Sequence, residues 1–213
     1  MAGCCEPRGY DQAFDPGRAR RSAARYRSRG LSRTARRIVD LVARRGIEGV
    51  TVLEIGGGVG DLQIELLRRG AARATNLELS AAYDDEARRL LADAGLADRA
   101  DRRLVDIATD PDAVEPADIV ILNRVVCCYP DFRRLLGAAA DHARSQLVFS
   151  HPPRNLLSRA VLGGENLSNR ITGCGFRAFA HPPEAMLAVL AEHGLRPTTP
   201  TVGRVWQIEA VAR

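Results

Sequence analysis

The sequence contains no lysine, and aromatic residues make up only 5% of it. All 31 basic residues are therefore arginines, which is typical of a GC-rich coding bias. For that reason the net charge of +5 is weak evidence for a nucleic-acid partner, and we do not expect one. Because aromatic residues are so few, the hydrophobic core must consist mainly of alanine, leucine, valine and isoleucine.

Long apolar runs are also missing. No run approaches the ~20 residues of a membrane-spanning helix, and the first residues lack the apolar core of a signal peptide. We therefore expect a cytoplasmic protein without a membrane partner. The five cysteines are an odd number, and they include the vicinal pairs Cys4-Cys5 and Cys127-Cys128. This pattern disfavours a disulfide framework, and without a C-x-x-C spacing we expect no metal site.

The positive charge is concentrated near the N-terminus. Residues 1–48 contain twelve arginines and five acidic residues, whereas the remainder of the chain has a net charge of −2. Such a segment is either a solvated helical face or a surface that attracts anionic partners. We predict that residues 1–47 form a basic helical lid segment and that residues 48–213 form the main domain. The side chains expected to fold over a ligand are Tyr10, Phe14, Tyr26 and Arg29.

A length of 213 residues suits one domain. Its apolar positions alternate between short runs and helical spacing, which predicts a parallel sheet with helices on both faces. The predicted strands are 50–55, 74–79, 103–106, 117–123 and 146–150, followed by two strands within 196–211. The predicted helices are 17–29, 31–46, 61–69, 80–94, 131–143 and 182–194.

Residues 151–180 interrupt this alternation. They are rich in proline and glycine, and they include the pair Gly163-Gly164. We predict an insertion that is partly helical at 156–162 and that forms one wall of the site. Its side chains suited to a polar or anionic acceptor are Arg154, Asn155, Asn166 and Arg170.

The most informative motif is a glycine-rich loop that links a predicted strand to a predicted helix. It runs from Glu54 to Gly60 and has the pattern E-x-G-x-G-x-G. Such a loop brings backbone N–H groups and a helix N-terminus close to a ligand, and side chains would block that approach. The dinucleotide pattern G-x-G-x-x-G fails in both registers, because Val59 and Asp61 stand where glycines are required.

Two further positions fit a nucleoside-containing cofactor. Glu78 ends the next predicted strand, about 20 residues after the loop, where an acid accepts hydrogen bonds from a ribose diol. The third predicted strand ends at Asp106, which is followed by Ile107.

Together these motifs resemble those of the class I methyltransferases that use S-adenosylmethionine (SAM). The resemblance covers about residues 48–150 and implies a doubly wound Rossmann-like α/β fold with seven strands, the last of them antiparallel. It also implies SAM as the cofactor, with Asp106 accepting from the adenine amino group, Ile107 packing on the ring and Glu54 near the methionine portion. The cofactor-binding residues expected on this basis are Tyr26, Glu54, Gly56, Gly58, Gly60, Glu78, Leu79, Asp106, Ile107 and Asn123.

The methyl acceptor is less well indicated. Asn123 is not followed by Pro-Pro, which argues against methylation of base amino groups. The runs 128–131 and 203–206 are loosely similar to those of magnesium-protoporphyrin O-methyltransferases and related small-molecule enzymes. We therefore expect transfer to an O or N atom of a small molecule. Arg124, Tyr129 and His151 are the candidate catalytic residues, with His151 as the candidate general base at the end of the fifth strand.

Two alternatives remain open at this point. One is methylation of a thiol or metalloid, with Cys4, Cys5, Cys127, Cys128 and Cys174 as soft thiolate ligands. The other is a SAM-binding protein without turnover, or an RNA-binding protein that uses its basic N-terminus. The sequence does not indicate an oligomeric state.

Overall fold

A seven-stranded sheet with the order β3-β2-β1-β4-β5-β7-β6 forms the centre of the computed structural model, which describes residues 9–201, 203 and 205–213. Strands β1 to β5 are parallel, and β7 is antiparallel to β5. The predicted mixed sheet with an antiparallel last strand is therefore confirmed. The strands are β1 (Thr51–Ile55), β2 (Arg73–Glu78), β3 (Ala100–Leu104), β4 (Ala117–Asn123), β5 (Ala143–His151), β6 (Arg196–Pro197) and β7 (Gln207–Ala212).

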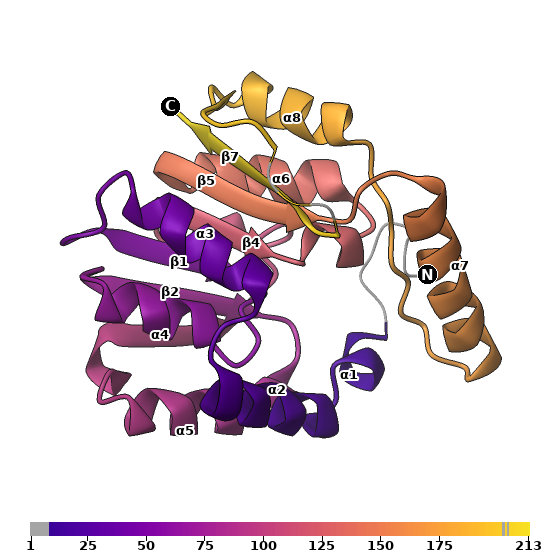
Figure 1. The fold of residues 1–213 in the computed structure, drawn as a ribbon, viewed down its shortest axis with the longest axis horizontal. Helices are drawn as coiled ribbons and strands as arrows, with labels where there is room; N and C mark the ends of the chain where they lie inside the picture. Colours follow the sequence, from indigo (N-terminus) through magenta and orange to yellow (C-terminus); the bar gives the residue numbers. More distant parts are fainter. Residues whose placement is uncertain (1–8, 202, 204) are drawn as a thin grey trace.

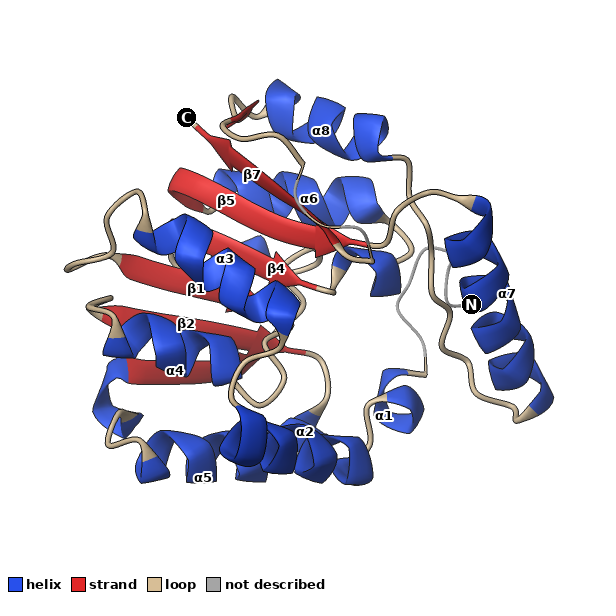
Figure 2. Cartoon of the chain, viewed as in Figure 1, coloured by secondary structure: helices blue, strands red, loops and turns tan. Residues whose placement is uncertain are grey.

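Helices cover both faces of this sheet (Figures 1 and 2). Helices α2 to α5 contribute to one hydrophobic cluster, and α6 and α8 contribute to the cluster on the opposite face. The helices are α1 (Tyr10–Ala13), α2 (Pro16–Arg29), α3 (Arg33–Ala43), α4 (Asp61–Arg68), α5 (Asp84–Asp93), α6 (Phe132–Asp141), α7 (Leu156–Ile171) and α8 (Pro183–Glu192).

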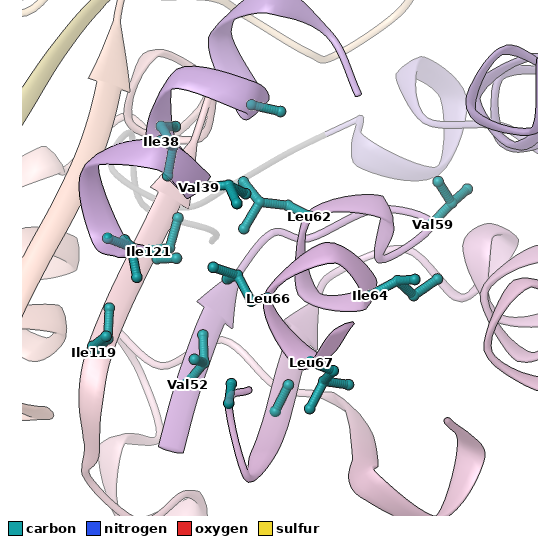
Figure 3. Close-up of a cluster of buried hydrophobic side chains, with 14 of the residues drawn as sticks. Ile38, Val39, Val52, Val59, Leu62, Ile64, Leu66, Leu67, Ile119 and Ile121 are labelled. Atoms are coloured by element: carbon teal, nitrogen blue, oxygen red, sulfur yellow. The ribbon is translucent and has the colours of Figure 1, made fainter. Parts of the chain in front are cut away.

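The central strand β4 shows why the sheet is apolar on both faces. Its Ile119 and Ile121 side chains join the cluster formed with α3 and α4, as Figure 3 shows. Val120 and Leu122, which alternate with them along the strand, belong to the cluster on the opposite face. A parallel sheet covered on both sides requires apolar residues at successive positions, which explains the run ADIVILN.

The parallel strands set the place of the site. Their carboxyl ends lie at one edge of the sheet, where open α/β folds bind ligands. The glycine loop follows β1, Glu78 ends β2, Asp106 lies two residues after β3, and Asn123 ends β4. Residues distant in the sequence are therefore brought together by the topology.

Several predicted boundaries are wrong; the fifth strand, for example, begins at Ala143 instead of residue 146, and the helix before it ends at Asp141. The third strand runs from residue 100 to 104, not from 103 to 106, because β3 is an edge strand whose partly exposed side chains give no apolar signal. The predicted helix 80–94 begins as a single 3-10 turn, and α5 proper starts at Asp84. At the C-terminal end β6 is only two residues long, so the last pair of strands is mostly β7.

The insertion is more regular than the sequence suggests. Helix α7 continues through Gly163-Gly164 to Ile171, and none of its 16 residues is buried. Its N-cap is Asn155, whose side chain accepts a hydrogen bond from the Ser158 N–H (2.8 Å). In Figure 1 this helix stands at the outer side of the molecule, away from the sheet. Across the described residues, no helix combines the length and apolarity that crossing a membrane would require.

Candidate active site

The glycine loop closes tightly between β1 and α4. Gly56, Gly58 and Gly60 have φ values of +65°, +55° and +75°, in the left-handed region that favours glycine. A Cβ atom at Gly56 would lie 2.5 Å from Cγ2 of Val125. This position therefore excludes any side chain, for both conformational and packing reasons.

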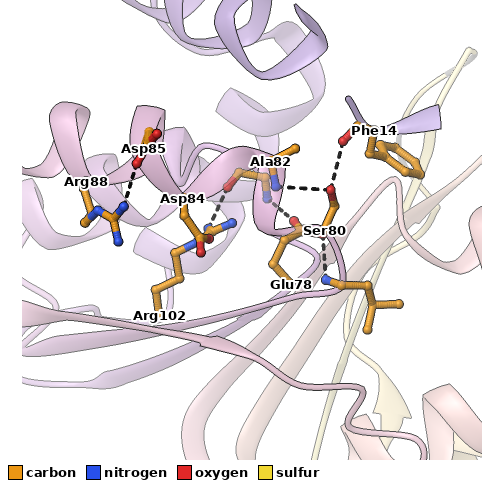
Figure 4. A network of polar contacts seen from close by, with 10 residues as sticks. Phe14, Glu78, Ser80, Ala82, Asp84, Asp85, Arg88 and Arg102 are labelled. Atoms are coloured by element: carbon orange, nitrogen blue, oxygen red, sulfur yellow. Dashed lines mark hydrogen bonds and ion pairs between the residues drawn. The ribbon is translucent and has the colours of Figure 1, made fainter. Parts of the chain in front are cut away.

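The Glu78 carboxylate joins the end of β2 to this loop. Its Oε2 accepts a hydrogen bond from the Gly58 N–H (2.8 Å), and its Oε1 accepts one from the Leu79 N–H (3.0 Å). Each carboxylate oxygen has further lone pairs, so the group retains acceptor capacity for a diol. Figure 4 shows Glu78 beside Ser80, whose hydroxyl donates to the Phe14 carbonyl (2.9 Å) and so ties the N-terminal segment to β2.

Asp106 is engaged from two sides. Its Oδ1 accepts from the Ala108 N–H (3.0 Å), and its Oδ2 accepts from the Tyr129 hydroxyl (2.8 Å). Burial and then the hydrogen bond to Asp106 raise the pKa of Tyr129, so its hydroxyl stays protonated at neutral pH. Ile107 is buried beside them. Tyr129, predicted to be catalytic, thus lies at the Asp106 end of the site and positions that carboxylate.

A cavity of about 340 Å³ lies over these strand ends. Its sheet side includes many of the predicted cofactor-binding residues. The N-terminal segment contributes a second side, and α7 with the strap that follows it (residues 172–182) contributes a third. The residues concerned are Glu54, Gly56, Gly58, Glu78, Leu79, Asp106, Ile107, Asn123, Arg124 and Tyr129 from the sheet side, Tyr10, Phe14, Arg18, Ser22 and Arg25 from the N-terminal segment, and Leu162, Glu165 and Phe176 from the α7 region.

Aromatic contacts hold the N-terminal segment against this strap. The ring centroids of Phe14 and Phe176 are 5.3 Å apart in an edge-to-face arrangement, and Tyr10 lies 5.8 Å from Phe176. The Tyr10 hydroxyl donates to the Cys128 carbonyl (2.6 Å). Burial, followed by the nearby Cys128, raises the pKa of Tyr10, so this hydroxyl is neutral and acts as a donor.

Two acidic side chains, one on each side of the loop in the chain, line the cavity. Glu54 is 2% exposed, and its Oε2 has no hydrogen-bond partner within the described part of the chain. Burial, and then repulsion from Asp61, raises the pKa of Glu54 well above its ordinary value. Burial also raises the pKa of Asp61, against the attraction of Arg25 at 3.8 Å. An unpaired buried acceptor at the cavity wall fits a cationic or hydrogen-bond-donating ligand group.

Replacing Glu54 by glutamine is expected to stabilise the ligand-free protein at neutral pH. Because the folded-state pKa is raised, the protonated form favours folding, and this stability is lost as the pH rises through that pKa. At pH 7 the variant should therefore melt higher, by roughly 2–4 °C for each kcal/mol of relieved penalty. Thermal unfolding between pH 4.5 and 8 measures the effect, which should shrink toward pH 4.5.

The matched control is Glu115→Gln, because Glu115 is an exposed carboxylate away from the loop. It should leave the melting temperature unchanged across the same range. A Glu54→Gln melting temperature equal to or below the wild type at pH 7 would show that Glu54 is not penalised in the folded state.

Among the described residues other than glycine, Arg124 alone has a positive φ (+63°). Its guanidinium lies over the Trp206 ring (4.8 Å to the centroid), and burial lowers its pKa. Its backbone N–H donates to the Ser150 hydroxyl (2.9 Å), which in turn donates to Oδ1 of Asn123 (3.0 Å). These bonds fix the strained turn after β4, and both Asn123 and Arg124 line the cavity.

Three predicted site residues lie elsewhere. His151 is 2% exposed and is not among the cavity-lining residues. Strand β5 extends through His151, whose ring is buried on the Phe149 side of the sheet, 5.7 Å from that ring and 3.5 Å from Glu209. This place does not suit a general base toward a ligand. Tyr26 packs in the core and donates to Glu65 (2.7 Å), and Gly60 supports the turn without lining the cavity.

Several residues that line the first cavity are not predicted from the sequence. Asp61 carries a detectable signal, because it is the first helical residue after the glycine loop. Arg18 and Arg25 belong to the basic helix α2, whose pattern does not distinguish cavity-facing arginines from solvated ones. Phe176 and Glu165 are placed by tertiary contacts alone.

A second cavity of about 470 Å³ adjoins the first, and Tyr10, Cys128 and Phe176 line both. Arg170 and Arg177 line the second cavity, and the structure shows neither paired with an acidic side chain of the described residues. Asn166 holds the backbone of Ala178 through both groups of its side-chain amide, and the Asn169 side chain donates to the Phe176 carbonyl, so both residues hold the strap. The two cavities are therefore neighbours with three shared lining residues, and the second one is lined by two arginines.

The cysteines give little support to a metalloid site. Sγ of Cys127 and Sγ of Cys128 are 3.7 Å apart, and Cys174 contacts the Gly9 carbonyl. Among the described residues, no three cysteine, histidine or acidic side chains are grouped as metal ligands. Cys4 and Cys5 lie outside the described residues.

Comparisons with known proteins agree with this geometry. A family model described as "Methyltransferase domain" matches residues 23–198. Among solved structures, magnesium protoporphyrin IX methyltransferase from Synechocystis PCC 6803, with bound S-adenosylhomocysteine (SAH), has a TM-score of 0.69 at 21% identity over 97% of both chains. An O-methyltransferase family protein from Burkholderia thailandensis has a TM-score of 0.72 at 20% identity, over 98% of this chain and 64% of its own.

A third similar structure is geranyl diphosphate C-methyltransferase from Streptomyces coelicolor A3(2), with a TM-score of 0.62 at 16% identity over 84% of this chain and 78% of its own. A search of the curated proteins finds no match. The resemblance to class I methyltransferases is confirmed by the family match. The structural matches span different acceptors, so they indicate the fold and do not identify an acceptor for this chain.

Proposed function

The chain belongs to the family of proteins with a methyltransferase domain, and from this premise we propose that it transfers a methyl group from SAM to an O or N atom of a small-molecule acceptor. The observation that supports the proposal is the pair of neighbouring cavities, the first suited to a nucleoside cofactor and the second to an acceptor. When bound, SAM would supply a methyl group attached to a cationic sulfur, and this sulfur is a good leaving group because it departs as the neutral thioether of SAH.

The residues of the first cavity suit the parts of SAM. Glu78 has the remaining acceptor capacity for the ribose hydroxyls. Asp106 and Ile107 offer a polar edge and an apolar surface for adenine. The unpartnered Oε2 of Glu54 suits the cationic methionine portion. The glycine loop provides backbone N–H groups at the start of α4, which favour a carboxylate.

The N-terminal segment and the strap complete the enclosure. Tyr10, Phe14 and Phe176 form an aromatic wall over the strand ends. Such a wall excludes water, and it holds the acceptor in line with the methyl group, which supplies much of the rate of a transfer reaction. Release of cofactor and product then requires residues 9–30 to move, which is the lid role expected from the sequence.

The second cavity, which we call the outer cavity, favours an anionic acceptor. Arg170 and Arg177 place two guanidinium groups there, and these bind carboxylates well. No histidine lines either cavity in the part of the chain that is described. A carboxylate is already ionised at neutral pH, so its oxygen needs no general base. We therefore favour an acceptor that carries a carboxylate, either as the methylated group or as an anchor.

Turnover with an acceptor panel tests this proposal. The purified protein is supplied with SAM and with aromatic carboxylates, hydroxybenzoates, primary amines or a neutral apolar thiol, and SAH release is measured. Carboxylate-bearing acceptors should be turned over preferentially. Comparable turnover of the thiol would count against the proposal.

The variant Arg170→Gln with Arg177→Gln should raise the KM of those acceptors about 10-fold or more, as expected for lost charged hydrogen bonds. SAH affinity should stay unchanged. Arg159→Gln is the control, because Arg159 lies on the same helix and lines neither cavity. An unchanged KM in the double variant would show that the acceptor does not bind in the outer cavity.

A further inference from the structure

The outer face of α7 is apolar and exposed to solvent. Five large apolar side chains on this helix are between 58% and 82% exposed, and they are Leu156, Leu157, Val161, Leu167 and Ile171. At about 100° per residue they fall within an arc of roughly 140°. The helix therefore presents one continuous apolar face outward, the reverse of an ordinary surface helix.

The opposite face of α7 is already occupied. Leu162 and Glu165 line the first cavity, and Asn166 and Asn169 hold the strap. The apolar face thus cannot turn inward without breaking the contacts that shape the site. An exposed apolar face that is fixed in place marks an interaction surface.

Charge indicates the kind of partner. Residues 151–180 contain four arginines and one acidic residue, for a net charge of +3, whereas residues 49–150 and 181–213 together have a net charge of −5. On a helical projection, Arg159 and Arg170 follow one edge of the apolar face. An apolar helix face bordered by arginines is the arrangement of helices that lie in the interface of anionic membranes.

A second copy of this chain fits this face less well. In an antiparallel two-fold pair of α7 helices, the arginine edges of both helices would lie on the same side of the contact. Arginines brought side by side in this way repel each other, which disfavours the pairing. A layer of anionic lipid headgroups instead meets the exposed Arg159, which lines neither cavity, while the acyl region receives the apolar side chains.

We propose that α7 docks the protein on anionic membrane surfaces, with its apolar face in the interface and its arginine edge at the headgroups. We expected no membrane partner from the sequence, because it contains no apolar run long enough to span a bilayer. A helix of 16 residues does not need to span in order to bind. This inference does not depend on the identity of the methyl acceptor.

Sedimentation with lipid vesicles tests the proposal on the full chain. Phosphatidylcholine vesicles containing 30% phosphatidylglycerol are compared with pure phosphatidylcholine vesicles at low and high salt. We expect binding to the anionic vesicles, weaker binding in high salt, and little binding to the neutral ones. Leu157→Gln with Leu167→Gln should lower the affinity about 10-fold or more, because interfacial binding scales with buried apolar area.

Leu104→Gln is the matched control, since Leu104 is a leucine 53% exposed on β3. It should bind vesicles like the wild type, and Arg159→Gln should reduce binding to anionic vesicles only. SAH binding and circular dichroism verify that each variant is folded. Equal binding to neutral and anionic vesicles, no binding to either, or a dimer in light scattering that Leu157→Gln with Leu167→Gln abolishes would each overturn the proposal.

Discussion

Replacing Glu78 by alanine should weaken the binding of SAH about 10- to 100-fold, which corresponds to ~1.5–3 kcal/mol for lost hydrogen bonds to a charged group. The carboxylate accepts from the N–H groups of Gly58 and Leu79, and it is the acceptor placed for a ribose diol. Its loss removes contacts to the cofactor and releases the glycine loop. Isothermal titration calorimetry with SAH measures the change directly.

Two variants separate these contributions. Glu78→Gln keeps the shape and one acceptor oxygen, so its affinity should fall between those of Glu78→Ala and the wild type. Asp101→Asn changes a carboxylate on the neighbouring strand β3 that is 46% exposed and paired with Arg103, so it should bind SAH normally. If Glu78→Ala retains wild-type affinity, the ribose is held elsewhere.

Replacing Gly56 by alanine is expected to have the larger effect. An alanine at φ +65° costs about 1–2 kcal/mol in the left-handed region, and its Cβ would clash with Val125 at 2.5 Å. Relieving the clash moves the loop or the turn after β4, and both line the cofactor cavity. We expect the protein to be destabilised and SAH affinity to fall about 100-fold or more, as for misplacing several binding groups at once.

The control for this variant is Gly163→Ala within α7. A Cβ there meets nothing within 4 Å, and alanine favours a helix more than glycine does. It should retain SAH binding and lose no stability. Denaturant unfolding and SAH titration are measured for both variants. Wild-type SAH affinity in a folded Gly56→Ala protein would mean that the loop does not contact the cofactor.

The cofactor half of the site could be predicted from the sequence because each of its motifs is local. Strand β1 leads into the loop Glu54–Gly60, and β2 ends at Glu78. Because the two strands are parallel, the loop and Glu78 lie at the same edge of the sheet. Asp106 also lines the first cavity, although the predicted bounds of β3 were wrong. The site depends on where these strands end, and that end is shared by all parallel strands.

The acceptor half could not be predicted in the same way. Whether a residue at a strand end faces the cavity depends on how far pairing continues, and the pair between His151 and Gln207 keeps His151 in β5, with its ring buried against Phe149. The positions of Phe176 and Arg177 depend on how α7 and its strap return over the cavity, and no local pattern encodes this. The outward apolar face of α7 is visible only when its inner face is known to be occupied.

The measurement that tests the central claim most directly is calorimetric titration of the wild-type protein with SAH, with NAD as the control ligand. The geometry of the glycine loop, Glu78 and Asp106 predicts micromolar binding of SAH and no binding of NAD. Binding of neither ligand would contradict the account, because the glycine loop would then be a structural turn and the cavity would serve another purpose.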